Sequence, residues 1–181
     1  MDSFDLLILG SGPSGQRAAI SAAKIGKRVA VIEQREFVGG VSVNTGTIPS
    51  KTFREGVLHL SGYNYRSIYG MNYRVKDKIT MADLAFRVQH VIKTEVDVTE
   101  AQLSRNNVEV LTGTASFEDA THIRVTNSRG SSVYETKNTL IAVGSRPATN
   151  PKVPINGNNI ITSDQILLIP ELPKTLIVVG G

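Results

Sequence analysis

The residues with the clearest potential for chemistry form a glycine-rich segment, residues 10–15, with the sequence Gly-Ser-Gly-Pro-Ser-Gly. The apolar run at residues 4–9 predicts a buried strand before it, and small and apolar residues at 13–26 predict a helix after it. In that setting the first glycine allows a tight turn, the second lets the backbone approach a pyrophosphate, and the third lets the helix pack closely on the strand. The helix N-terminus also offers N–H groups to the pyrophosphate. The sequence therefore predicts a dinucleotide site that includes Gly10, Gly12, Pro13, Ser14 and Gly15.

An acidic residue extends this motif. Glu33 ends the second predicted strand, residues 28–33, and lies 18 residues beyond the last glycine (33 − 15), where a carboxylate can accept hydrogen bonds from an adenosine ribose. The alternative is a glycine-rich turn beside a surface glutamate. A carboxylate repels a ribose 2′-phosphate, which disfavours NADP at this site, although Arg35 nearby leaves NADP open.

A second segment, residues 39–51, reads Gly-Gly-Val-Ser-Val-Asn-Thr-Gly-Thr-Ile-Pro-Ser-Lys. It resembles the flavin disulfide reductases, whose signature is Gly-Gly-x-Cys-x-x-x-x-Cys-x-Pro-x-Lys. Ser42 and Thr47 occupy the two cysteine positions, and the chain contains no cysteine. Because a hydroxyl cannot form a disulfide, the dithiol relay of that family is excluded. The resemblance implies FAD as the cofactor, with Gly39, Gly40 and Thr47 among its binding residues.

Lys51 matches the lysine that lies near the flavin N5 edge in that family, where a cation could stabilise reduced, anionic flavin. The alternative is an exposed lysine in the first turn of a helix. Residues 46–51 resemble more specifically the transhydrogenase group of this family, which transfers hydride between NADPH and NAD through FAD. Residues 52–55, 73–77 and 89–92 extend the resemblance over essentially the whole chain. Ser42 departs from that group, which commonly has a cysteine there.

Two further segments resemble flavin-binding parts of the family. Residues 139–147 resemble a strand end at which Gly144 lets the backbone pass near the flavin nucleotide, and Gly113 and Ala115 match a segment whose backbone contacts the adenine. The alternative is that residues 139–147 are an ordinary strand end and that Gly113 and Ala115 belong to an ordinary antiparallel strand. Residues 178–181 would begin a second glycine motif, the fingerprint for a nicotinamide nucleotide.

The expected fold is α/β: a Rossmann-like FAD-binding domain with a parallel sheet flanked by helices and an antiparallel β-meander. The apolar runs predict parallel strands at residues 6–9, 29–32, 108–110 and 140–143, and a further buried strand at 176–179. Helices are predicted at 13–26, 49–60 and 80–105, the last with a capping box at Thr80 and Asp83, and the meander at about 114–136.

Residues 1–150 are expected to be the N-terminal part of the FAD-binding domain, and residues 151–181 a connection and the first strand of a truncated NAD(P)-binding domain.

Composition excludes several other classes of protein. With 181 residues, 40% hydrophobic and 20% charged, the chain is typical of globular proteins, and its net charge of +4 comes from scattered rather than clustered basic residues. Nucleic-acid binding is therefore not expected. No apolar run is long enough for a membrane helix and no secretory signal precedes the first strand, which favours a cytoplasmic protein without membrane contact. His59, His90 and His122 lack the spacing of a metal site, so none is expected.

The resemblance to this family implies an FAD-dependent oxidoreductase that transfers hydride between NADPH and NAD, with pyridine nucleotides as substrates and a homodimer at full length. The chemistry needs orientation and electrostatics rather than an acid or base. The 181-residue chain alone is expected to be inactive. The alternatives are a related flavoprotein that reduces a quinone or oxygen, and a module that binds a dinucleotide without turning it over.

Overall fold

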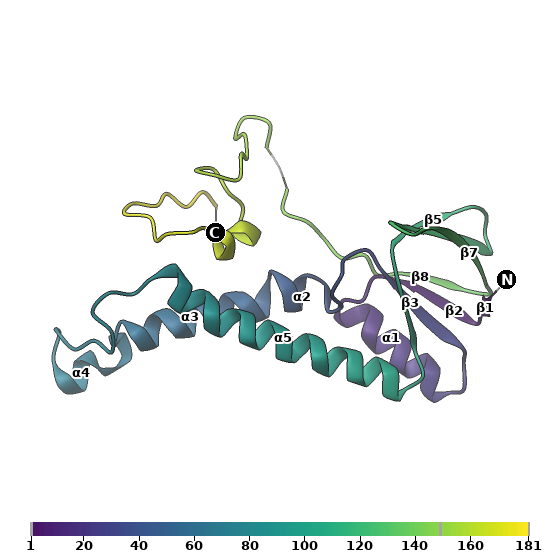
Figure 1. Cartoon of the computed structure of the whole chain (residues 1–181), viewed down its shortest axis with the longest axis horizontal. Coiled ribbons are helices and arrows are strands. Elements are labelled where there is room, and N and C mark those ends of the chain that lie inside the picture. The colour runs from purple at the N-terminus through teal and green to yellow at the C-terminus, as the bar shows by residue number, and fades with distance from the viewer. Residues whose placement is uncertain (1, 149, 181) are drawn as a thin grey trace. The chain divides into compact units, whose positions relative to one another are not determined.

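The computed structural model describes residues 2–148 and 150–180, and it divides into two compact units. The sheet unit comprises residues 1–47 and 92–146, and the helical unit comprises residues 48–91 and 147–181. Figure 1 labels many of the helices and strands of both units.

A four-stranded parallel sheet forms the centre of the sheet unit. Its strands are β2 (Leu6–Leu9), β3 (Val29–Glu33), β4 (Glu109–Thr112) and β8 (Thr139–Ile141), in the order β4-β3-β2-β8. Helix α1 (Pro13–Lys24) connects β2 to β3 (Figure 1), in a crossover that registers Ile8 against Val31. Both residues are completely buried, as expected for parallel strands covered on two faces. The prediction of a parallel α/β sheet is confirmed.

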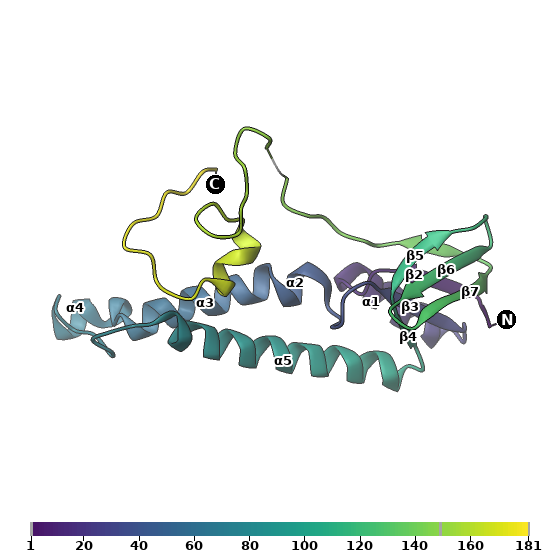
Figure 2. The ribbon, with the colours of Figure 1, turned by 45° about the horizontal axis from the view of Figure 1, so that its top comes forward.

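An antiparallel meander forms a second sheet in the same unit. It contains β5 (Thr114–Phe117), β6 (His122–Asn127) and β7 (Gly130–Thr136), which lie side by side in Figure 2. The two-residue strand β1 (Ser3–Phe4) adds to β7 in parallel. A core cluster unites the two sheets, with Phe4, Leu7, Ile32 and Ile123 among its buried members. The predicted meander is confirmed.

The expected first strand, residues 4–9, is interrupted at Asp5. Phe4 pairs with the meander, whereas Leu6 begins the parallel sheet. The Asp5 N–H donates to the Arg28 carbonyl at 2.9 Å, and an Asp5 carboxylate oxygen accepts the Arg28 N–H at 2.9 Å. These bonds hold the chain where it passes from one sheet to the other.

The helical unit contains α3 (Thr47–Leu60) from Ile48 onward, together with the start of α5 (Met81–Arg105), which ends in the sheet unit. The predicted capping box is confirmed, because the Thr80 N–H donates to Asp83 Oδ2 at 2.9 Å and the Asp83 N–H donates to Thr80 Oγ1 at 3.3 Å. A Cβ on Gly56 would lie 3.4 Å from the Leu84 side chain, so α3 and α5 pack closely there.

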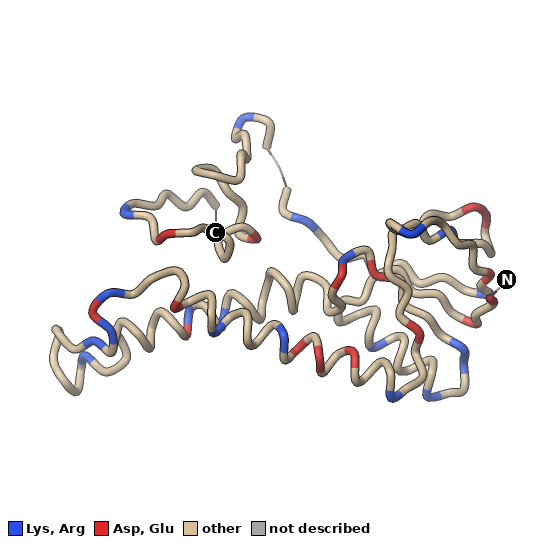
Figure 3. Tube along the Cα trace, viewed as in Figure 1, with Lys and Arg blue, Asp and Glu red and all other residues tan. Residues whose placement is uncertain are grey.

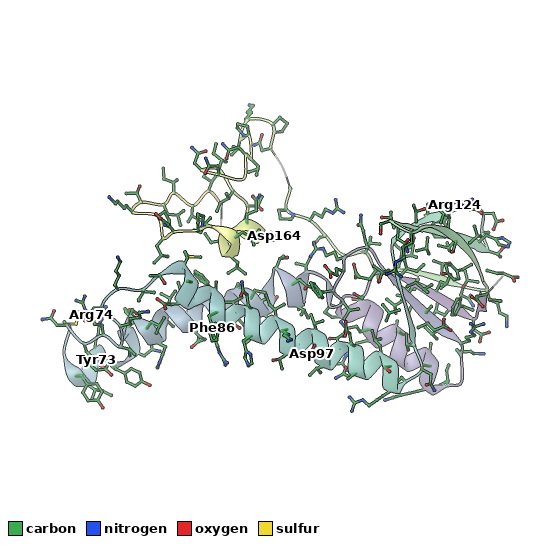
Figure 4. The ribbon with its side chains drawn as sticks, viewed as in Figure 1. Tyr73, Arg74, Phe86, Asp97, Arg124 and Asp164 are labelled. Carbon is green, nitrogen blue, oxygen red and sulfur yellow. The ribbon has the colours of Figure 1, made fainter. Side chains whose placement is uncertain are left out.

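Between these two helices lie a 3₁₀ turn, η1 (Tyr63–Tyr65), and the short helix α4 (Arg66–Tyr69). Side chains of this segment form an exposed aromatic group, in which the rings of Tyr69 and Tyr73 have centroids 4.9 Å apart. Figure 4 labels Tyr73 at this end of the helical unit.

Several boundaries differ from those expected. Helix α3 begins two residues before Pro49, and a short helix, α2 (Gly40–Asn44), begins at the second glycine of the pair at residues 39–40. Strand β8 ends at Ile141, because the last ladder bond there is from the Ala142 N–H to the Leu9 carbonyl, at 2.8 Å.

The predicted strand at residues 176–179 is wrong for this structure. The segment has no regular structure, and Ile177 is 88% exposed. No strand of the described residues pairs with this segment, so an extended conformation there would not be stabilised by hydrogen bonds to a neighbouring strand. Earlier in the chain, the described residues 147–148 and 150–159 form an irregular connection, and a 3₁₀ helix, η2 (Ser163–Leu168), lies between this connection and residues 176–179.

Among residues 2–148 and 150–180, no helix combines the length and the apolar character needed to cross a lipid bilayer.

Candidate functional site

A cavity of about 480 Å³ lies in the sheet unit at the carboxyl ends of the parallel strands. Leu9, Glu33 and Ile141 bring the ends of β2, β3 and β8 to its wall. In open parallel sheets this edge is where ligands bind, and the volume falls within the range of small-molecule sites. Strand ends that are far apart in the sequence therefore lie together in the wall of this cavity.

The glycine-rich turn forms one wall of this cavity. Gly10 has a φ of +104°, and a Cβ there would lie 2.5 Å from the Ala142 carbonyl oxygen, so no other residue fits without displacing the end of β8. A Cβ on Gly15 would collide with the Gly10 carbonyl, so the helix α1 sits directly against the turn. A Cβ on Gly12, in contrast, would meet no atom within 4 Å. The space at Gly12 is therefore left open on the side from which a ligand would approach.

Helix α1 begins in this wall. Gly12 is its N-cap residue and Pro13 occupies its first turn, where the missing proline N–H costs no hydrogen bond. The Gly12 carbonyl accepts the Gln16 N–H at 2.9 Å, which starts the helix. Pro13 and Ser14 line the cavity, so the positive end of the helix dipole faces it.

Glu33 lies at the end of β3, lines the cavity and is 7% exposed. Its Oε2 accepts the Ser11 N–H at 3.0 Å and also a hydrogen bond from the Ser11 hydroxyl, while Oε1 accepts the Arg35 N–H at 3.0 Å. A carboxylate has about four acceptor positions, so one remains, on Oε1. The predicted acid is thus held by three donors and keeps one position for a further donor.

The glycine pair after β3 packs on the glycine-rich turn. A Cβ on Gly40 would lie 2.8 Å from the Gly12 Cα, and Gly39 has a φ of +106°. The Asn44 side-chain amide donates to the Gly40 carbonyl at 2.9 Å and to the Val38 carbonyl at 3.1 Å. These bonds connect the last residue of α2 to the backbone at the start of the helix. Ser42, at the first expected cysteine position, lines the cavity.

The opposite wall comes from later in the chain. Gly113 follows β4, and its N–H donates to the Glu33 carbonyl at 2.8 Å. A Cβ on Gly113 would lie 2.7 Å from a Val125 methyl group, so the meander packs directly on this turn. Ala115 and Gly144 also line the cavity. The structure therefore brings together the predicted site residues at the ends of β2 and β3, at the start of β5 and after β8.

Thr47 and Lys51 lie on α3, and the Lys51 side chain is exposed. The cavity is lined by residues 9–14, 32–35, 40–42, 113–115 and 140–146, so neither residue is among its lining. The position of Lys51 beside a flavin stays a prediction.

Sequence reasoning missed Ser11, Gln34 and Arg146 as parts of this site. All three line the cavity, and the Arg146 guanidinium donates to the Gln34 side-chain oxygen at 3.4 Å. Ser11 stands at a variable position of the glycine motif, where the pattern carries no signal for its side chain. Arg146 lies two residues after Gly144, the predicted glycine of the β8 strand end. A positive charge close to that glycine was the signal that could have identified Arg146 as a site residue.

None of the three histidines is among the residues that line the cavity. His122, on β6, pairs its Nδ1 with Asp119 Oδ2 at 2.8 Å, away from the cavity lining. The Thr121 N–H and the His122 ring lower the pKa of Asp119 to about 2. Among the described residues, no group of three His, Asp or Glu side chains is arranged to hold a metal ion.

Charges of both signs are interspersed along the described trace in Figure 3, as the scattered basic residues of the sequence predict. On the meander, for example, Arg124 pairs with Glu118, and Figure 4 labels Arg124 there.

Comparison with known proteins identifies a family. The family model described as pyridine nucleotide-disulphide oxidoreductase matches residues 4–181. A protein named soluble pyridine nucleotide transhydrogenase from Mycobacterium bovis (strain BCG / Pasteur 1173P2) is 48% identical over 183 residues, which cover 100% of this chain and 39% of the relative. A protein of the same name from Colwellia psychrerythraea is 36% identical over 179 residues, with 98% of this chain and 38% of the relative covered.

Solved structures agree with this similarity. The structure of LpdA from Mycobacterium tuberculosis superposes with a TM-score of 0.79 at 27% identity and covers 94% of this chain and 38% of that one. The Cu(II) complex of the HOCl-induced flavoprotein disulfide reductase RclA from Escherichia coli gives 0.75 at 25% identity, over 96% of this chain and 36% of that one. The chain thus spans about two fifths of the length of the curated relatives it matches.

Proposed function

Because this chain belongs to the pyridine nucleotide-disulphide oxidoreductase family, we propose that it supplies the FAD site of an enzyme that transfers hydride between NADPH and NAD. One observation carries the proposal: the glycine-rich turn, Glu33 and the Gly113 turn line a single cavity at the carboxyl ends of the parallel strands. The similarity to relatives named soluble pyridine nucleotide transhydrogenase supports the choice of reaction.

The residues present fit FAD. The open space at Gly12 and the N-terminus of α1 suit the pyrophosphate, since both leave backbone N–H groups accessible from the cavity. Glu33 suits the adenosine ribose, because its remaining acceptor position can accept a hydrogen bond from a ribose hydroxyl.

The other predicted glycines would contact the remaining parts of the cofactor. Gly113 and Ala115 would lie against the adenine, and Gly40 and Gly144 would let backbone approach the flavin nucleotide. Gly39 supports Gly40, because its positive φ allows the turn that begins α2.

Bound FAD would supply the two-electron acceptor and donor through which hydride passes between nicotinamides. The chain's part is to bind and orient it. Arg35 and Arg146 line the cavity and offset the negative charge of the pyrophosphate. Thr47 and Lys51 would contribute from α3, with the Lys51 ammonium providing a positive charge near the isoalloxazine. Ser42 and Thr47 cannot form a disulfide, so these positions provide no route to a dithiol substrate.

The domain assignment extends this proposal. Residues 1–150 would be the N-terminal part of the FAD-binding domain, and residues 151–181 a connection and the beginning of an NAD(P)-binding domain. The whole enzyme would be a cytoplasmic homodimer that binds pyridine nucleotides, without nucleic-acid or membrane partners. The word soluble in the names of the relatives supports the absence of a membrane partner.

A comparison of electron acceptors tests the proposed reaction. The protein at its full natural length, reduced with NADPH, should be reoxidised rapidly by NAD and slowly by oxygen or a quinone, and it should not reduce lipoamide or oxidised glutathione. Preferential reoxidation by a quinone or by oxygen would favour the alternative flavoprotein function. Absence of reduction by any nicotinamide nucleotide would favour a non-catalytic dinucleotide module.

A further inference from the structure

Ser11 lies between the first two glycines of the turn and is completely buried. Its hydroxyl donates to Glu33 Oε2 and accepts the Gly39 N–H at 3.0 Å. Its carbonyl accepts the Gln16 side-chain amide at 2.8 Å. One small side chain therefore joins the glycine-rich turn, the end of β3 and the glycine pair before α2.

These bonds determine what Glu33 can offer. The Ser11 N–H and hydroxyl together use both acceptor positions of Oε2, and the Arg35 N–H uses one of the two on Oε1. The carboxylate cannot rotate without breaking hydrogen bonds to a buried charge, which are among the stronger ones in proteins. Only Oε1 is left to accept a hydrogen bond from a ligand in the cavity.

The Ser11 hydroxyl has one proton, and it is already donated to Glu33. It therefore has no proton to donate to a ligand, even though Ser11 is part of the cavity wall. Any effect of this hydroxyl proton on the ligand must pass through the carboxylate.

We propose that Ser11 is a positioning residue for nucleotide recognition: it orients Glu33 so that Oε1 accepts a hydroxyl of the adenosine ribose. This inference rests on the proposed function, since it takes the ligand of the cavity to be FAD. It assigns a role to a position that the glycine motif leaves variable, and it explains why a serine with a buried hydroxyl is useful there.

A purely structural Ser11 would affect every ligand of the cavity equally. A Ser11 that acts through Glu33 affects only ligands that carry ribose hydroxyls. The two roles are therefore separated by comparing FAD with an FAD analogue whose adenosine lacks the 2′ and 3′ hydroxyls.

The experiment measures dissociation constants for both ligands by flavin fluorescence, on protein of full natural length from which the flavin has been removed. Ser11→Ala should weaken FAD binding about tenfold, the effect of losing a hydrogen bond to a charged group, while binding of the analogue changes less than about twofold. Ser21→Ala is the matched control, because it removes a hydroxyl from an exposed position on α1, and it should change neither constant.

The possible results each decide a different point. Equal weakening of both ligands by Ser11→Ala, or no weakening of either, would overturn this inference alone. Equal binding of FAD and the analogue by the unaltered protein would overturn the assignment of the ribose to Glu33, and this inference with it. If Ser11→Ala does not fold, Ser11→Cys keeps the volume with a weaker donor; it should show the same selective loss, and unchanged FAD binding would contradict the inference.

Discussion

Glu33 combines burial with an acceptor position that still faces the cavity. Three hydrogen bonds from Ser11 and Arg35 compensate its charge, and among the described residues it makes no ion pair. These donors are neutral N–H and O–H groups, and they leave one acceptor position on Oε1 for a ligand. A ribose hydroxyl can donate a hydrogen bond to this position, whereas the carboxylate would repel the negative charge of a ribose 2′-phosphate.

Replacing Glu33 with Ala should weaken FAD binding by about 1.5 to 3 kcal/mol, because charge-assisted hydrogen bonds to the ribose are lost. Equilibrium titration of the flavin-free protein with FAD measures the change. Glu36→Ala is the control, since Glu36 is an exposed acid three residues further on that does not line this cavity. Unchanged FAD affinity in the Glu33→Ala variant would refute the role of this carboxylate.

The sequence could predict Glu33 but not the side chain that holds it. Spacing from the glycine motif identifies the acid, because the strand-helix-strand unit fixes where the second strand ends. Ser11 occupies a position that the motif leaves free, and its bond to Glu33 spans residues 22 apart that meet only after β2 and β3 pair. Arg146 is likewise brought to Gln34 only by the pairing of β8 with β2.

Among the elements, α5 has the most clearly defined start. Lys76 and the Thr80 N–H both donate to the Asp83 carboxylate, and these two bonds, in that order, lower the pKa of Asp83 from 3.8 to about 2. A carboxyl whose pKa is lower in the folded state stabilises that state above the unfolded pKa and loses this effect as the pH falls through the folded pKa.

The contribution of Asp83 should therefore be complete above about pH 4 and should disappear between pH 3.8 and about 2. Denaturant unfolding at a series of pH values, for the unaltered protein and Asp83→Asn, measures it as the difference in unfolding free energy. Asp97→Asn makes the same charge change at an exposed position of the same helix and should not reproduce this dependence. A difference that stays constant down to pH 2 would contradict the capping role.

Elements with a strong local pattern were predicted well, and those fixed by tertiary contacts were not. Helices α1 and α5 carry their own start signals, and β2 and β3 are apolar almost throughout. Local sequence patterns were therefore sufficient to predict these four elements. The break at Asp5 depends on bonds to Arg28, and α2 depends on Asn44 reaching back to Val38. Residues 176–179 have the apolar composition of a strand but no strand beside them in the described residues, and composition alone could not reveal that.

At the scale of the whole molecule, the chain covers about two fifths of its curated relatives. Strand β8 is at one edge of its sheet, and Ile141 and Val143 near its end are 63% and 70% exposed. We propose that part of the flavin site of the longer relatives lies in the portion that this chain does not match.

Residues 1–181 by themselves should accordingly hold FAD weakly or not at all and transfer no hydride, because contacts to the flavin ring are expected from outside this range. Size-exclusion chromatography with FAD, followed by an assay of NADPH-to-NAD transfer, measures both properties. Hydride transfer by this chain alone would show that the site is already complete.

If the cavity around the glycine-rich turn holds the FAD through which hydride passes, blocking that cavity must stop the reaction. The most direct measurement is NADPH-to-NAD hydride transfer by the full natural-length protein and its Gly12→Val variant, each supplied with excess FAD. Because a Cβ on Gly12 would meet no atom within 4 Å, valine should leave the fold intact and obstruct only the pyrophosphate. We expect transfer by the unaltered protein and none by the variant. Equal transfer by the two proteins would contradict the assignment of the cavity to FAD.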